Sequence, residues 1–124
     1  METNSNFKEQ LAEIDERIIK LKKDIAIGKA LEALHENEDF KLVIMEGYFV
    51  EEEKRLSGLL FNPTSLKRDQ LENIMDKTTA IRNYKQYFQT VLINASMAPE
   101  QIEDEENFRK EITAEASIVD VEAE

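Results

Sequence analysis

The sequence predicts an all-α protein, and three observations lead to this fold class. The chain of 124 residues contains only three Gly and two Pro, fewer than the turns of a β-rich protein need. Strong helix formers such as Glu, Lys, Leu and Ala dominate the composition. Apolar residues recur at steps of three or four, which is the spacing of one helix face. We expect an antiparallel helical hairpin (about 40–60 and 66–95) with a long N-terminal coiled-coil-like helix and a short acidic C-terminal helix.

The N-terminal helix, residues 1–37, carries one narrow apolar seam with the heptad spacing of a coiled coil. Asn4 or Ser5 is the expected N-cap. The seam consists of Phe7, Leu11, Ile14, Ile18, Leu21 and Ile25. Such a seam on an otherwise charged helix needs a partner helix. The partner can belong to the same chain or to another, because the charges that flank the seam do not settle the orientation. We expect this seam to engage another protein subunit.

Residues 38–96 are expected to form the hairpin core. Asn37 or Asp39 caps its first helix, and Thr64 or Ser65 caps its second. Asn62-Pro63 separates the two, because a residue before proline disfavours the helical conformation. A connection this short makes the helices antiparallel neighbours. The apolar face expected on the first helix is Phe40, Val43, Ile44, Tyr48, Leu56, Leu59 and Leu60. That expected on the second is Leu71, Ile74, Thr78, Ile81, Tyr84, Phe88, Val91 and Leu92.

The C-terminal part of the chain is expected to be a separate short helix, residues 97–116, followed by a tail. Pro99 occupies a position where first-turn prolines occur. The acidic segment 117–124 has too few apolar residues to order itself, so a disordered tail is expected.

The charge of the chain is negative and unevenly placed. The net charge is −11, of which residues 97–124 contribute −8, since they contain ten acids against Arg109 and Lys110. This balance argues against direct binding of nucleic acid and of anionic membranes, both of which favour clustered Lys and Arg. No run of about 20 apolar residues is present, and the N-terminus has no secretory pattern. We therefore expect a cytoplasmic protein.

No residue pattern points to catalysis, a metal or a cofactor. The chain has no cysteine, and the run 103–106 lacks the alternating ligands and the glycine of a calcium loop. His35 is the only histidine, and its polar surroundings indicate a solvated helix end. Common nucleotide-binding, hydrolase and zinc motifs are missing. We expect a protein that is not an enzyme.

Aromatic residues form the second group of candidate interaction residues. Tyr84, Tyr87 and Phe88 lie beside Arg82 and Lys85. This mixture can stack single-stranded bases, but the acidic balance favours aromatic side chains that face inward. Elsewhere, the adjacent pair Tyr48 and Phe49 is expected to place one ring in the core and the other against a partner.

Residues 30–110 resemble small helical proteins of the structural gene modules of tailed bacteriophages. The similarity rests on Ala30-Leu31-Glu32-Ala33-Leu34, Phe40 to Phe49, Glu52 to Leu56, Asn62-Pro63 and Ile81 to Phe88. Glu46-Gly47-Tyr48-Phe49 and Tyr84 to Phe88 are its more specific parts, and the first 29 residues lie outside it. The resemblance implies a non-enzymatic virion or assembly protein that acts near the capsid, portal or connector. Its partners would be protein subunits, itself included, in the host cytoplasm during assembly and then in the virion. The alternative is an acidic inhibitor that imitates DNA phosphates toward a host DNA-binding protein.

Overall fold

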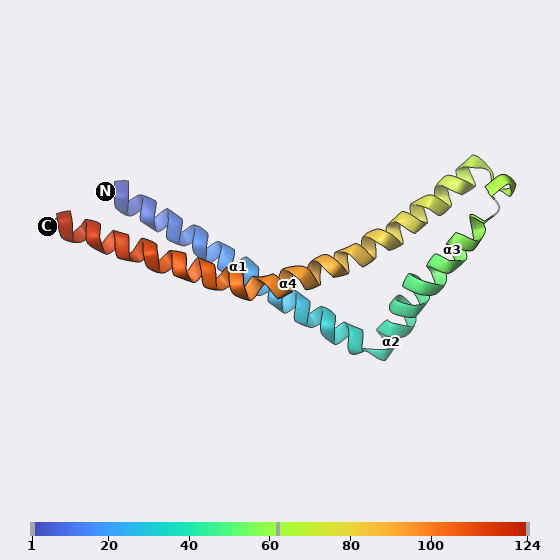
Figure 1. Cartoon of the computed structure of the whole chain (residues 1–124), viewed down its shortest axis with the longest axis horizontal. Coiled ribbons are helices and arrows are strands. Elements are labelled where there is room, and N and C mark those ends of the chain that lie inside the picture. The colour runs from blue at the N-terminus through green and yellow to red at the C-terminus, as the bar shows by residue number, and fades with distance from the viewer. Residues whose placement is uncertain (1, 62, 124) are drawn as a thin grey trace. The chain divides into compact units, whose positions relative to one another are not determined.

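The computed structural model describes the backbone of residues 2–61 and 63–123, and side-chain exposure for residues 6–61 and 64–118. Over these ranges the chain is almost entirely helical and contains no strand, which confirms the all-α fold class. The elements are the α-helices α1 (Glu2–Glu36), α2 (Glu38–Phe40), α3 (Glu53–Leu59) and α4 (Arg68–Ala123), the π-helix η1 (Lys41–Glu52) and the 3₁₀-helix η2 (Pro63–Ser65) (Figure 1).

These elements form two compact units. The arm unit combines Met1–Lys29 with Ile93–Glu124, and the hairpin unit is Ala30–Leu92. Helices α1 and α4 each contribute to both units.

The hairpin unit has the predicted antiparallel arrangement. The helical segment 38–59 leads to the turn at η2, and the first part of α4 then runs back in the opposite direction (Figure 1). Its core consists of the buried residues Phe49, Leu56, Ile74 and Ile81. Val43 and Leu59, expected on the buried face, are instead 62% and 42% exposed. The core therefore depends on a narrower stripe than the sequence suggested.

The π-helix η1 carries part of this stripe. From Phe40 to Glu53 the half-buried and buried positions are Gly47 and the adjacent pairs 40/41, 44/45, 48/49 and 52/53. Two of these pairs, 44/45 and 48/49, belong to or pack against the core cluster that also contains Ile74 and Ile81 of α4. Val43 lies outside the pairs and is exposed.

The ends of the hairpin helices follow the predicted signals in part. The side chain of Asn37 caps α2, because its Oδ1 accepts a hydrogen bond from the backbone N–H of Phe40 at 2.9 Å. Thr64 and Ser65 lie in η2, and α4 begins only at Arg68. The α4 end is held by Gln70, whose Oε1 accepts from the backbone N–H of Lys67 at 3.0 Å. Asn62 lies outside the described residues.

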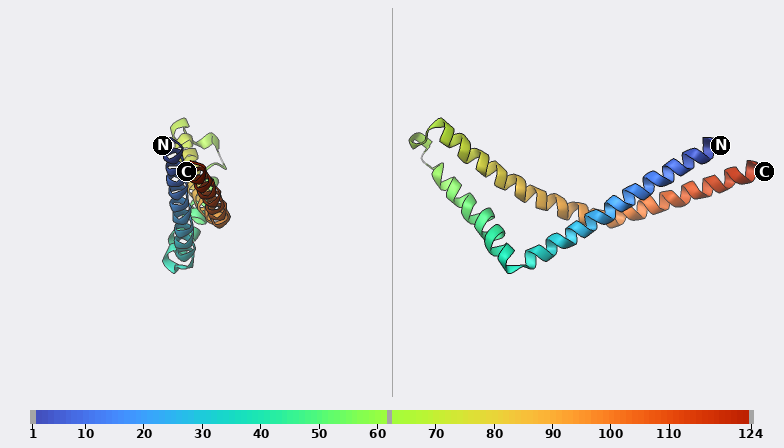
Figure 2. Two further views of the ribbon diagram at one scale, coloured as in Figure 1. Left: turned by 90° about the vertical axis from the view of Figure 1, so that its left-hand side faces the viewer. Right: turned by 180° about the vertical axis from the view of Figure 1, so that it is seen from behind.

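The arm unit is an antiparallel pair of helices. The first part of α1 and the last part of α4 lie side by side in opposite directions (Figures 1 and 2). Buried Ile14 and Ile18 of α1 pack against Ile112 of α4, and Phe7, Leu11 and Ile102 surround them. The buried and half-buried positions of α4 here are Ala95, Ala98, Ile102, Glu105, Arg109, Ile112 and Ala116, a second heptad seam.

Helix α4 passes through Pro99 without interruption, although two separate helices were expected around this residue. Proline in a helix interior removes one backbone hydrogen bond and costs about 3 kcal/mol. Packing against α1 compensates, because Ala98 has no exposed surface and Ile102 lies against the α1 seam. The same helix extends to Ala123, into the segment expected to be a disordered tail.

Both long helices change their heptad register where one unit gives way to the other. Along α1 the packed positions Ile25, Gly28 and Leu31 are separated by two successive steps of three. Along α4 the same two steps of three occur at Lys85, Phe88 and Val91. Two consecutive steps of three locally overwind a coiled coil. Each unit therefore keeps its own register, and both breaks lie beside the unit boundaries at Lys29 and Leu92.

Candidate protein-interaction site

The predicted seam of α1 is covered by the chain itself. Ile14 and Ile18 are 0% and 5% exposed, and Phe7, Leu11, Leu21 and Ile25 are half-buried. The sequence left open whether the seam packs within the chain. The structure shows that it does, although its partner is the acidic segment of α4 and not the hairpin. The seam is consequently not a free surface for another subunit.

Ion pairs fix the direction of this contact. Arg17 Nε lies 2.8 Å from Glu105 Oε1, and Arg109 pairs with Asp15. The hydrogen bond to Glu105 raises the pKa of the Arg17 guanidinium. Glu105 and Arg109 occupy seam positions, where charged residues specify register and orientation at some cost in stability. The two ion pairs thus join charged residues that the antiparallel alignment of the arm unit brings together.

The aromatic candidates divide between the core and the surface of the hairpin unit. Phe49 is 6% exposed, with its ring centroid 5.5 Å from those of both Tyr84 and Phe88. Tyr48 and Phe88 are half-buried around it. Tyr84 and Tyr87 remain 42% and 58% exposed. At the Tyr48–Phe49 pair the core ring is that of Phe49, while Tyr48 also packs against the core, and its contact with a partner stays a prediction.

His35 has a different environment from the solvated helix end that the sequence suggested. Its ring lies 5.9 Å from the rings of both Phe40 and Phe88. Its Nε2 is buried and has no hydrogen-bond partner within the described chain. The polar residues next to it in sequence did not reveal this packing, because Phe88 lies 53 positions away along the chain.

An open apolar groove runs between η1 and α4 in the hairpin unit. The groove has a volume of about 750 Å³. Its floor includes Leu56 and Ile81, which are both 1% exposed. Its lining consists of Val43, Ile44, Gly47, Tyr48, Glu52, Leu56, Lys77, Ala80, Ile81 and Tyr84.

A second, smaller hollow of about 440 Å³ shares Lys77 with this groove and continues it toward the hairpin turn. It is lined by Leu59, Leu66, Asp69, Gln70, Asn73, Ile74 and Lys77. The two hollows together are called the hairpin groove below. From Asp69 to Tyr84 the groove follows α4 for about 22 Å, at 1.5 Å per residue. This is the length of four helical turns, so the groove can accept a helix.

One sequence pattern does indicate the groove, although it lies beside the predicted core face of α4. Ala80, Tyr84 and Tyr87 follow one another at steps of four and three on α4, so they share a helix face beside the core stripe. Half of the lining of the larger hollow comes from the π-helix η1, and π-helical turns frequently occur at functional sites. The widening of η1, which brings Val43 and Gly47 to the groove, has no comparable sequence signal.

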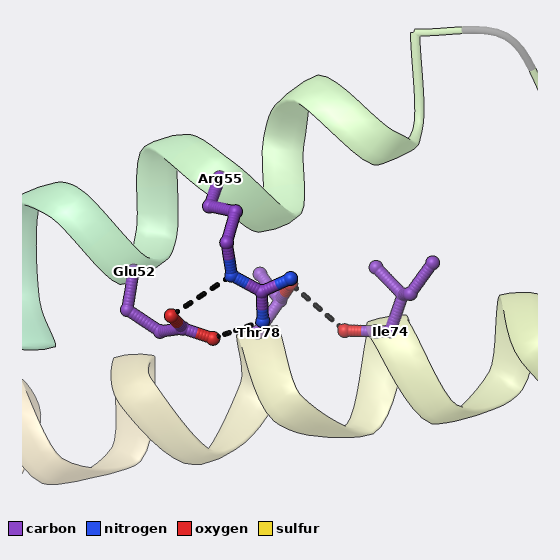
Figure 3. A network of polar contacts seen from close by, with 4 residues as sticks. All are labelled: Glu52, Arg55, Ile74 and Thr78. Carbon is purple, nitrogen blue, oxygen red and sulfur yellow. Dashed lines mark hydrogen bonds and ion pairs between the residues drawn. The ribbon is translucent and has the colours of Figure 1, made fainter.

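The charges at the groove are few and locally balanced. Arg55 of α3 points toward α4 near Thr78 and donates from its Nε to Glu52 Oε2 at 3.0 Å, while the Thr78 hydroxyl donates to the backbone oxygen of Ile74 at 2.9 Å (Figure 3). The hydrogen bonds from Arg55 lower the pKa of the Glu52 carboxyl below its usual value, and Lys77 adds to this lowering. Reciprocally, Glu52 raises the pKa of Arg55.

The described part of the chain has neither a metal-binding cluster nor a membrane-spanning helix. Within it, no group of three or more His, Cys, Asp or Glu residues is placed to hold a metal ion. None of its helices combines the length and apolarity that crossing a membrane requires. Comparison with protein-family models, with curated proteins and with solved structures finds no match.

Proposed function

We propose that this chain is a non-enzymatic structural or assembly protein of a bacteriophage virion, which binds capsid, portal or connector subunits through helix packing. The observation that carries the proposal is the hairpin groove, a helix-length apolar surface that no described part of the hairpin unit fills. Contiguous exposed apolar surface of this kind marks interaction sites in proteins. The virion context rests on the resemblance of residues 30–110.

The contact surface in this proposal differs from the one expected from the sequence. The seam Phe7 to Ile25 is buried within the arm unit, so it serves the fold. In this proposal other subunits bind instead to the residues that line the groove, among them Val43 and Tyr84. Helix-in-groove recognition reads a partner through apolar side chains at helical spacing, which suits a groove four turns long.

The proposal is tested by binding of purified chain to virion subunits or to particles that lack it. The variant Val43→Lys places a charge in the groove, and Val50→Lys is its matched control. Both valines lie in η1 with 62% and 54% exposure, but Val50 lines neither hollow. We expect Val43→Lys to abolish co-sedimentation with particles and Val50→Lys to retain it. Equal binding by both variants, with unchanged helix content, would contradict the groove as the contact surface.

A second candidate function is the acidic inhibitor that imitates DNA. One observation favours it: the acids of residues 97–123 lie on a regular helix and not in an unstructured tail. Glu100, Glu103, Asp104 and Glu106 are all exposed. This candidate predicts that a Glu103→Gln, Glu106→Gln double variant binds a host DNA-binding protein less tightly and with a reduced salt dependence.

A further inference from the structure

The hairpin groove leaves substantial apolar surface open beside a well-packed floor. Tyr84, together with Tyr87 one helical turn beyond the groove, leaves roughly 200 Å² open, given an aromatic side chain of about 200 Å² and exposed fractions of 42% and 58%. Val43 and Leu59 add to this surface at 62% and 42% exposure. Two helices that pack side by side leave the groove between them open on the outside, and here the residues along that groove are mostly apolar.

We infer that the occupant of the hairpin groove is a second copy of this chain, bound through the same groove across a two-fold axis. The inference rests on the proposed function in one respect, namely that the groove binds protein. In such an isologous contact the same residues appear on both sides. Two helical hairpins packed in this way form a four-helix arrangement, which is a common stable solution for amphipathic helices.

The charge of the groove suits a copy of itself. Its larger hollow contains one acid, Glu52, and one base, Lys77, and the smaller adds Asp69. Strongly basic or strongly acidic helices would find little charge to pair with on this surface. Two copies of a nearly neutral apolar face meet without the repulsion that two like-charged faces would suffer.

The size of the groove suits a dimer as well. Sixteen different residues line the two hollows, and Tyr87 extends the apolar surface by one helical turn. Standard protein interfaces use about 20–30 residues on each side. The groove and Tyr87 therefore supply seventeen residues of each copy, and rim contacts must supply the remainder of such an interface.

The seam and the hollow of the arm unit offer the groove no free apolar face. The arm seam is already filled by Ile14, Ile18 and Ile112. The third hollow, in the arm unit, is lined by Arg17, Lys20, Leu21, Gln101, Asp104 and Glu105, of which only Leu21 is apolar. Exposed Phe108 and Ile118 of the arm unit are separated along α4 by Lys110, Glu111 and Glu115. A helix face able to fill the groove is thus offered by the hairpin of a second copy.

The test is the solution mass of the full chain by light scattering coupled to size exclusion, over a tenfold concentration range. We expect twice the chain mass of 14.4 kDa at the upper concentrations. The variant Ala80→Glu puts a charge into the groove at an exposed position, and Thr79→Glu puts the same charge one residue away, on an exposed position that lines neither hollow. We expect Ala80→Glu to raise the dimer dissociation constant by at least about a hundredfold, because it buries an unpaired charge, while Thr79→Glu remains dimeric.

A chain that is monomeric over the whole range, or an Ala80→Glu variant that dimerises like the unaltered chain, would overturn the inference. Circular dichroism of both variants shows that the helices are intact in the comparison. The proposed function is judged separately. A monomeric chain that binds particles, and whose binding is abolished by Val43→Lys, would overturn only the inference of a second copy. A dimer that depends on the groove but binds no virion subunit would support the inference and contradict the virion role.

Discussion

Single buried residues carry the packing of the arm unit, and Ile14 is the clearest case because it has no exposed surface. Truncation of a fully buried isoleucine removes its contacts and leaves a cavity, so Ile14→Ala is expected to lower the free energy of unfolding by about 2–5 kcal/mol. Ile19 on the same helix is 67% exposed, and Ile19→Ala should change stability by less than about 0.5 kcal/mol. Urea unfolding followed by circular dichroism compares them. Equal effects would show that the α1 seam is not packed against α4.

The ion pair of Glu52 and Arg55 gives the hairpin unit a defined pH response. Hydrogen bonds from Arg55 lower the folded-state pKa of Glu52 below its usual value of 4.5. Because the folded pKa is lowered, the stabilisation is complete above the unfolded pKa and is lost as the pH falls through the folded pKa. The stability difference between the chain and an Arg55→Gln variant should therefore disappear at the acid end of a titration. NMR titration of the Glu52 carboxyl should show its pKa rising in Arg55→Gln, and an unchanged pKa would contradict the pairing.

At the scale of the element, the α1 seam is expected to behave as a fold contact and not as a docking surface. Ile18→Asp should therefore lower the helix content of the free chain, because it buries a charge between α1 and α4. Ile19→Asp, one position along and exposed, should leave the helix content unchanged. The comparison is made by circular dichroism on the isolated protein. A folded Ile18→Asp chain that merely loses a partner would mean that the seam is free.

Pro99 is expected to lower the stability of helix α4. Helix α4 continues through this residue at the cost of one backbone hydrogen bond. Pro99→Ala is expected to raise the free energy of unfolding by up to about 3 kcal/mol, since alanine restores the N–H donor and has the best helix propensity. Thermal unfolding measures the change. A loss of stability would indicate that the proline ring itself contributes packing that alanine cannot replace.

The elements of the hairpin were predictable from the sequence because their signals are local. Asn37 caps its helix as expected, and Leu56, Ile74 and Ile81 lie in the core as their spacing indicated. The continuity at Pro99 was not predictable, because it depends on burial of Ala98 and Ile102 against a helix about 80 residues earlier in the chain. The hairpin groove was not predictable for a similar reason. The helix propensities of residues 41–52 do not distinguish the π-helical turns of η1 from α-helical ones, and η1 supplies Val43 to the groove.

At the scale of the whole molecule, the negative charge is concentrated in the last part of the sequence. Residues 97–124 carry −8 of the net charge of −11, whereas the hairpin groove is nearly neutral. Association through the groove is therefore expected to depend weakly on ionic strength, because salt screens charges and not apolar contacts. Measuring particle binding between low and high NaCl concentrations checks this. A steep loss of binding with salt would favour the acidic-inhibitor candidate over the groove.

The central claim is that the hairpin groove contacts other protein subunits, and side-chain footprinting with hydroxyl radicals tests it most directly. Tyr84 lines the groove, and Tyr87 lies one helical turn beyond it on the same face of α4. Met75, which is 54% exposed and lines neither hollow, is the internal control on the same helix. Oxidation is compared between the chain alone at low concentration and the chain bound to its subunits. We predict protection of both tyrosines with little change at Met75. Protection of Met75 with unchanged tyrosines would contradict the account.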